Sequence, residues 1–108
     1  MLCEYQVEVV AKCPVDNCPD LYRCTVRSRR IIPVETILKA IAELNDKPRY
    51  QEEFTERLHR SLAAQVETTG HHSGVKTRCV CGELDDVLSE QSRFTDARGL
   101  VSGDAGPG

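Results

Sequence analysis

The sequence predicts a single α+β domain in which two helices pack on one face of an antiparallel β-sheet. Two N-terminal segments alternate apolar and polar residues, two central segments repeat apolar residues at helical spacing, and a further strand-like segment follows them. Grouped strands and grouped helices are typical of α+β domains rather than of alternating α/β folds. The length of 108 residues suits one core.

The N-terminal half of the predicted sheet is a hairpin. Apolar residues occupy the odd positions of 3–11, and residues 21–28 alternate in the same way with Arg23 and Arg27 on the polar side, as half-buried strands do. Pairing would set a Glu/Gln face against an Arg face, which favours antiparallel strands. Residues 13–20 between them are rich in turn-forming residues. We expect the polar face to meet water, a lumen or a partner.

The middle of the chain predicts two helices. The first follows Pro33, which suits a first helical turn, and its apolar residues recur at helical spacing as far as Leu44. The second is expected from about Tyr50 to Val66, with apolar residues four apart along one stripe, and Gly70 is expected to end it.

The C-terminal part is predicted to complete the sheet and then leave it. Residues 75–81 are expected to form a third strand, and a fourth is expected within 84–88 or 94–101. The domain should cover residues 1–88, because residues 89–108 are acidic and rich in Gly and Ser, as tails are.

Composition excludes several classes of protein. The net charge of −3 argues against a globally basic nucleic-acid-binding protein. No apolar run approaches the roughly 20 residues of a membrane span, and the start lacks the pattern of an export signal. A cytoplasmic protein is therefore expected. Its six cysteines would be thiols, metal ligands or a nucleophile rather than disulfides.

Two segments resemble families that share the tunnelling fold. Residues 10–22 (Val-Ala-Lys-Cys-Pro-Val-Asp-Asn-Cys-Pro-Asp-Leu-Tyr) are similar to the Cys-Pro-x-x-x-x-Pro-Asp-Phe segment of the queuosine-pathway nitrile reductases. Residues 49–55 (Arg-Tyr-Gln-Glu-Glu-Phe-Thr) resemble both the His-Glu-Asp segment of those reductases and the Gln-Glu-Arg-Leu-Thr helix start of type I GTP cyclohydrolases. The resemblance covers residues 4–82 and implies a ββααββ unit whose copies join into a barrel around a tunnel.

The resemblance implies a homo-oligomeric enzyme, with sites between subunits, that acts on the nitrile of 7-cyano-7-deazaguanine. Reduction to the 7-aminomethyl product with NADPH is the family default, and a short relative instead adds ammonia, making an amidine on tRNA. Of the reductases' NADPH signature only Glu35, Leu38 and Lys39 correspond, so Lys39 is the candidate cofactor-binding residue. A protein that binds a purine or pterin without turnover is a further alternative.

Cys13 is the candidate nucleophile and Asp20 its proton-transfer partner. A thiolate adds to an electrophilic nitrile carbon to give a covalent thioimide. A loop position beside Lys12 is expected to leave the thiol accessible in electropositive surroundings. Asp20 would accept the thiol proton and return it to nitrogen. From the residues alone, a buried structural cysteine and an exposed turn aspartate are the alternative.

Glu52 is the candidate residue for binding the ring. The resemblance implies a carboxylate that accepts two parallel hydrogen bonds from a guanine-like base, a strong and planar arrangement. Glu53 is held in reserve, and Gln51, which replaces the reductases' histidine, is a further substrate-binding candidate. From the residues alone, acidic residues at a helix start also suit a solvated face.

Zinc is the alternative to a nucleophile. Four thiolates can hold zinc tetrahedrally, and two cysteines of the predicted third strand point to the same side of it. The spacings Cys-x-Cys and Cys-x4-Cys are looser than paired Cys-x-x-Cys knuckles. The candidate ligands are Cys13, Cys18, Cys79 and Cys81.

Two polar clusters carry weaker signals. Residues 27–30 (Arg-Ser-Arg-Arg) form a basic cluster that would suit tRNA phosphates, although a loop of this kind is often basic for solubility alone. His71 and His72 lie after the second predicted helix without a located partner, as residues of a polar turn do.

Overall fold

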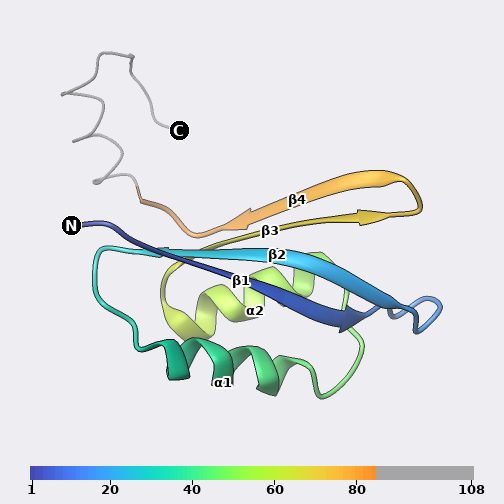
Figure 1. Cartoon of the computed structure of the whole chain (residues 1–108), viewed down its shortest axis with the longest axis horizontal. Helices are drawn as coiled ribbons and strands as arrows, with labels where there is room; N and C mark the ends of the chain where they lie inside the picture. Colours follow the sequence, from blue (N-terminus) through green and yellow to red (C-terminus); the bar gives the residue numbers. More distant parts are fainter. Residues whose placement is uncertain (85–108) are drawn as a thin grey trace, which may run out of the picture.

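The structure is a computed structural model and describes residues 1–84. Its strands form one antiparallel sheet in the order β1-β2-β3-β4, and both helices cover the same face of that sheet (Figure 1). The predicted α+β class and the strand-strand-helix-helix-strand-strand order are confirmed. The elements are β1 (Cys3–Lys12), β2 (Pro19–Ser28), α1 (Val34–Leu44), α2 (Gln51–Leu62), β3 (Gln65–His72) and β4 (Val75–Cys81).

The β1–β2 hairpin forms in the register that the alternation favours. Glu4 lies opposite Arg27, and Glu8 lies opposite Arg23. Both pairs are ion pairs, with nitrogen–oxygen distances of 3.7 Å and 3.6 Å respectively. The apolar side chains of both strands therefore point together toward the helices, and the charged ones point to the open face.

Helix α1 starts and ends where its sequence indicates. Pro33 precedes it, and the backbone N–H of Asn45 closes its last turn by donating to the carbonyl of Ile41. Because its apolar residues share one stripe, the helix lies flat on the sheet. The buried residues are Ile37, Ala40, Ile41 and Leu44.

Helix α2 is shorter than the apolar stripe predicts. It ends at Leu62 because Ala63 adopts the left-handed conformation, with φ of 51°, and the chain then turns back into the sheet. Val66, expected to end the helix, lies in β3 opposite Val26 and is fully buried there. The guanidinium of Arg30 donates to the carbonyls of Leu62 and Ala63, so one arginine of the basic cluster caps this helix.

The strand that the sequence does not reveal is β3. Gly70, expected to terminate a helix, lies in this strand opposite Tyr22. A Cβ at Gly70 would come within 3.1 Å of the Leu21 carbonyl oxygen, so the glycine permits a close approach rather than ending an element. Segment 75–81, expected to be a strand, is β4. A further strand was expected within 84–88 or 94–101, and these residues, apart from Leu84, lie outside the part of the chain that the structure describes.

The core lies between the helices and the inner face of the sheet. Phe54 and Leu58 of α2 are at most 1% exposed and contact the buried side chains of the central strands. The rings of Tyr22 and Phe54 lie 5.9 Å apart between centroids, which joins α2 to the middle of the sheet. Strands β1 and β4 form the two edges of the sheet.

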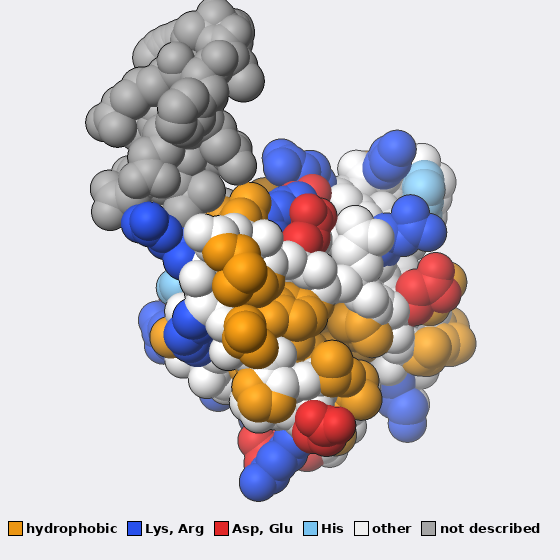
Figure 2. Space-filling model, turned by 60° about the vertical axis from the view of Figure 1, so that its left-hand side comes forward, with side chains coloured by type: hydrophobic (Ala, Val, Ile, Leu, Met, Phe, Trp, Pro, Cys, Tyr) orange, Lys and Arg blue, Asp and Glu red, His pale blue; other side chains and the backbone are white. Residues whose placement is uncertain are grey.

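Large apolar side chains are also exposed. Figure 2 shows such side chains gathered on the face turned toward the viewer. Around the start of α1, Ile31, Val34 and Leu38 are 72%, 55% and 50% exposed. Clustered apolar surface is typical of proteins that associate, but the expected homo-oligomer stays a prediction. No helix within residues 1–84 is long and apolar enough to cross a membrane.

The open face of the sheet carries a charge network centred on Glu67. Its carboxylate lies 2.8 Å from Arg27 and 2.7 Å from Arg78, and its side chain is only 13% exposed. The hydrogen bond from Arg78, with a further contribution from Arg27, lowers the pKa of Glu67 from its ordinary value of 4.5. The folded state therefore favours the ionised carboxylate.

Replacing Glu67 by Gln is expected to make stability less sensitive to acid. A lowered carboxyl pKa contributes stability above the ordinary value of 4.5, and this contribution is lost as the pH falls through the lowered value. The variant should lose about 1 kcal/mol at pH 7 and show a flatter decline below pH 4.5. Urea unfolding at several pH values measures both effects. Glu43→Gln, an exposed change on α1, should keep the wild-type acid profile.

Candidate functional site

A pocket of about 200 Å³ lies where the β1–β2 loop, the start of α2 and the β3–β4 turn meet. These three segments are far apart in the sequence, and only the complete sheet brings them together. Small-molecule pockets usually measure roughly 300–1,000 Å³. The space within one chain therefore suits a small, flat molecule, or part of a larger one.

Strand register assembles one wall of this pocket. Ala11 pairs with Asp20 across β1 and β2, and Tyr22 pairs with Gly70 across β2 and β3. Continuing the second antiparallel register by two residues sets Asp20 opposite His72. The Nδ1 atom of His72 lies 3.5 Å from Oδ1 of Asp20. The histidine for which the sequence shows no partner thus lies beside a predicted site residue.

Cys13 lies directly after β1 in a tight loop. Its backbone N–H donates to the carbonyl of Cys18 at 2.9 Å, and its carbonyl accepts from Asn17 at 2.8 Å. The ligand atoms of Cys13, Asp20 and His72 all lie within 4.8 Å of one another. The structure therefore brings the two predicted residues together and adds a histidine to them.

The expectation of an openly exposed thiol is wrong for the single chain. Cys13 is only 5% exposed, because it continues the alternation of β1 and its side chain lies on the inner face of the sheet. It nevertheless lines the pocket, together with Asp20 and Tyr22. A reagent would therefore reach the sulfur through the pocket rather than from bulk solvent.

Asp16 is a charged group near Cys13 that sequence reasoning missed. Its Oδ1 accepts the backbone N–H of Cys18 at 3.0 Å. This bond, followed by one from the Cys13 thiol, lowers the pKa of Asp16. The negative charge of Asp16 in turn raises the pKa of Cys18, which disfavours a thiolate there. The Asp-x-Cys spacing is typical of an Asx turn, and it was the sequence signal that could have placed Asp16 in this loop.

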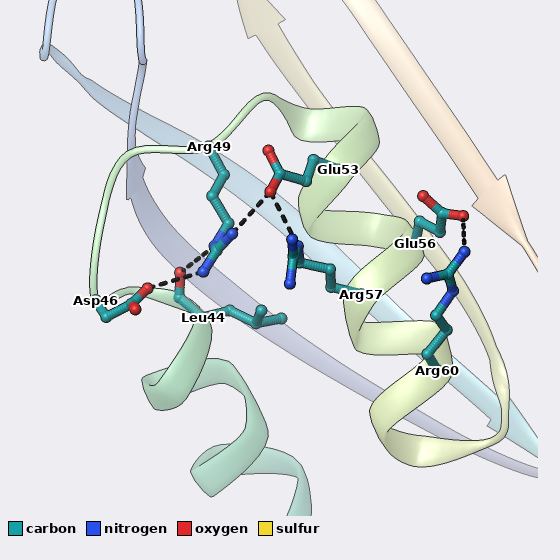
Figure 3. A network of polar contacts seen from close by, with 7 residues as sticks. All are labelled: Leu44, Asp46, Arg49, Glu53, Glu56, Arg57 and Arg60. Atoms are coloured by element: carbon teal, nitrogen blue, oxygen red, sulfur yellow. Dashed lines mark hydrogen bonds and ion pairs between the residues drawn. The ribbon is translucent and has the colours of Figure 1, made fainter.

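The two glutamates at the start of α2 have different surroundings. Glu52 is exposed and lines the pocket, and within residues 1–84 no cation forms an ion pair with it. Glu53 accepts hydrogen bonds from Arg49 at 2.7 Å and from Arg57 at 2.9 Å (Figure 3). The Arg49 bond is the main reason that the pKa of Glu53 is lowered. Glu53 therefore belongs to a structural network and does not line the pocket, and its reserve role stays a prediction.

Gln51 lines the pocket, but its amide is occupied. Its Nε2 donates to the carbonyl and to the hydroxyl of Thr68 at 3.2 Å and 3.1 Å. Its Oε1 accepts from the hydroxyl of Thr77 at 2.6 Å. Gln51 therefore ties the start of α2 to β3 and β4, and its predicted contact with substrate stays a prediction.

Arg49 fixes the loop that leads into α2. It is 8% exposed and donates to the Leu44 carbonyl at 3.1 Å as well as to Asp46 and Glu53 (Figure 3). The C-terminal end of α1 is thereby connected to the first turn of α2. This connection holds the backbone on which Glu52 is presented to the pocket.

Two aromatic side chains complete the pocket. Tyr22 is 4% exposed and forms part of the inner wall, whereas Tyr50 is 57% exposed. Burial, followed by the charge of Asp20, raises the pKa of Tyr22 to about 12, so its phenol is neutral. Aromatic faces of this kind suit stacking against a flat heterocycle.

The predicted cofactor and metal ligands do not meet at this site. Lys39 is exposed on α1 and does not line the pocket. Cys79 and Cys81 lie on β4 opposite Thr68 and Val66, and burial raises the pKa of Cys79. Among the described residues the four thiols form no common cluster, so a single chain does not assemble the predicted four-cysteine zinc site.

The fold of the chain is also found in solved structures. A four-stranded antiparallel sheet with both helices inserted after its second strand is the tunnelling fold, as the resemblance implies. One similar solved structure is described as the crystal structure of the archaeosine synthase QueF-like in the apo form, with 16% identity and a TM-score of 0.64. The match covers 74% of this chain and 90% of that one.

The likeness establishes the fold of the chain. No protein-family model matches the sequence, and a comparison with curated proteins finds none that is similar. The function proposed for the pocket therefore rests on the residues that line it.

Proposed function

We propose that this chain is a subunit of an enzyme that adds the thiol of Cys13 to the nitrile of a 7-cyano-7-deazaguanine-type base. The observation that carries the proposal is the meeting of Cys13, Asp20 and Glu52 in one pocket. The likeness to a structure described as an archaeosine synthase supports the same substrate class.

The first step needs only groups that the pocket supplies. The sulfur of Cys13 bonds to the nitrile carbon, and the thiol proton passes along the side of the pocket that Asp20 lines to the nitrile nitrogen. The triple bond becomes a carbon–nitrogen double bond, and the product is a thioimide without any redox change. Glu52 accepts the ring N–H and the exocyclic amine of the base, which fixes the nitrile near the sulfur.

For the second step we propose addition of ammonia. Ammonia attacks the thioimide carbon, the Cys13 thiol leaves, and an amidine remains. Reduction would instead require two hydrides, for example from two NADPH molecules. Ammonia is favoured because Lys39, the candidate NADPH ligand, lies outside the pocket and only three signature positions correspond. The similar structure is also described as an archaeosine synthase. The nitrile would then be carried by tRNA.

We also propose that copies of the chain assemble as the fold family does. The unpaired edges of β1 and β4 and the exposed apolar residues of α1 support this assembly. A neighbouring subunit would enlarge a pocket that is small within one chain.

Intact-mass measurement tests the first step. Wild-type protein incubated with 7-cyano-7-deazaguanine is expected to gain the mass of one ligand, Cys13→Ala to gain none, and Cys18→Ala to behave as wild type. If saturating nitrile leaves the wild-type mass unchanged while calorimetry shows that it binds, the protein is a purine-binding protein and the nitrile chemistry is wrong.

The second step is resolved in the same samples. With ammonium present, the amidine is expected by mass spectrometry, and NADPH absorbance should stay constant. Consumption of two NADPH per nitrile would instead establish reduction. Supplying the nitrile as free base and as tRNA-bound base in parallel identifies the form that is used.

A further inference from the structure

We propose that His72 is the residue that exchanges the proton with Cys13, and that Asp20 orients His72. This inference rests on the proposed function and deepens it. The observation that carries it is the cluster of Cys13, Asp20 and His72, whose ligand atoms lie within 4.8 Å of one another. Gln51 stands where the reductases' histidine is expected, and its amide is fully engaged.

The turn between β3 and β4 fixes the position of His72. Ser73 and Gly74 both have positive φ, 52° and 81°, as in a two-residue turn that matches the twist of the flanking strands. His72 and Val75 therefore pair at the end of the hairpin. This register, and not a flexible loop, places the imidazole beside β2.

Asp20 suits the role of the orienting carboxylate. Its side chain is 15% exposed, compared with 50% for His72, and its Oδ1 lies 3.5 Å from the imidazole Nδ1. A carboxylate beside Nδ1 fixes the orientation of the ring and directs the other ring nitrogen away from itself. The arrangement of a nucleophile, a base and a group that orients the base is the usual one for activated thiols.

A histidine supplies what the carboxylate alone lacks. An ordinary aspartate is almost fully ionised at neutral pH, with a reference pKa of about 3.9, and holds a proton poorly between steps. Imidazole titrates near neutral pH and can therefore both accept a proton and donate it again. In the first step the thiol proton passes to His72 and from there to the nitrile nitrogen as the carbon–sulfur bond forms. In the second, His72 takes a proton from the attacking ammonia and returns it to the departing thiolate.

The charged side chains around this histidine come from several elements. Asp20 of β2, Glu52 of α2 and Arg49 line the pocket with it, and Asp16 lies in the β1–β2 loop beside Cys13. The charge of Arg49 is already paired with Asp46 and Glu53. On β4, Lys76 lies opposite His71, and Arg78 pairs with Glu67.

Alkylation of Cys13 by iodoacetamide tests the proposal without any turnover. Peptide mapping would follow the rate at this one thiol from pH 5.5 to 9.5 in wild type, His72→Gln and His71→Gln. In wild type the rate is expected to rise near neutral pH, when imidazole becomes able to accept a proton. In His72→Gln it should rise only toward about pH 8.5, where an unassisted thiol ionises. At pH 7 alkylation of the variant should be at least about tenfold slower.

His71→Gln is the matched control, because His71 neighbours the same pocket but lies outside the cluster. It should retain the wild-type shape of the pH profile. Thermal unfolding should show His72→Gln folded, as its half-exposed side chain allows. The rate of thioimide formation from the nitrile should fall in His72→Gln by about 100-fold or more.

Two results would overturn the proposal. One is an alkylation profile of His72→Gln that coincides with wild type at every pH. The other is stoichiometric zinc in the purified protein that is lost in His72→Gln, which would make the cluster a metal centre. Because alkylation needs no nitrile, a changed profile with no nitrile adduct would reject the proposed substrate while keeping the role of His72.

Discussion

Replacing Glu52 by Gln is expected to weaken the binding of a guanine-like base by about 100-fold, or roughly 2.7 kcal/mol. In the proposed complex the carboxylate would accept two hydrogen bonds from the ring, and both would be charge-assisted. The amide of glutamine keeps one acceptor but turns an N–H₂ group toward another donor. Glu52 is exposed and forms no ion pair within residues 1–84, so the fold should be unaffected.

Calorimetry in a Cys13→Ala background measures this affinity without covalent capture. Glu53→Gln is the matched control, because Glu53 contacts Arg49 and Arg57 but does not line the pocket. The control should bind within about threefold of its parent and unfold at a lower temperature. Equal affinity losses in the two variants would show that Glu52 has no special place in binding.

Leu58→Ala is expected to cause the largest loss of stability. Leu58 is fully buried between α2 and the sheet. Truncating a buried leucine typically costs 2–5 kcal/mol, and we expect about 3–4 kcal/mol here. Domains are stable by only about 5–15 kcal/mol, so the variant should unfold at least 10 °C earlier.

Calorimetric or circular-dichroism melting curves provide the measurement. Leu38→Ala removes the same atoms from a side chain that is 50% exposed on α1 and should cost about 0.5 kcal/mol or less in the isolated chain. A loss in Leu38→Ala that matches Leu58→Ala would contradict the placement of the core between α2 and the sheet.

Local patterns predicted most of the fold. Strict alternation in β1 and β2 and the narrow stripe of α1 leave each element one way to bury its apolar side. Strand β3 was not predicted, because only two of its residues, Val66 and Thr68, are buried. Val66 also continues the four-residue spacing of the apolar residues in α2. The left-handed turn at Ala63 breaks that spacing, and an alanine gives little sequence signal for such a turn.

The same strand explains what was missed at the site. Cys13, Asp20 and Glu52 were candidates because short segments resemble known families. His72 could be placed only through the register of β3 against β2, which links residues about fifty positions apart. For the basic cluster of residues 27–30, the short segment alone suggested contacts with tRNA phosphates. The structure gives two of its arginines roles within the fold, because Arg30 caps α2 and Arg27 pairs with Glu4 and Glu67.

The network around Arg49 has a consequence for which molecules can enter the pocket. Arg49 is the one arginine lining it within residues 1–84, and Asp46 and Glu53 already neutralise its charge. Asp20 and Glu52 therefore leave an excess of negative potential in a confined space. Phosphate groups would be repelled at the entrance. An uncharged nucleobase is therefore expected to enter more readily than a phosphate group, and a polyanionic strand attached to it is expected to remain outside.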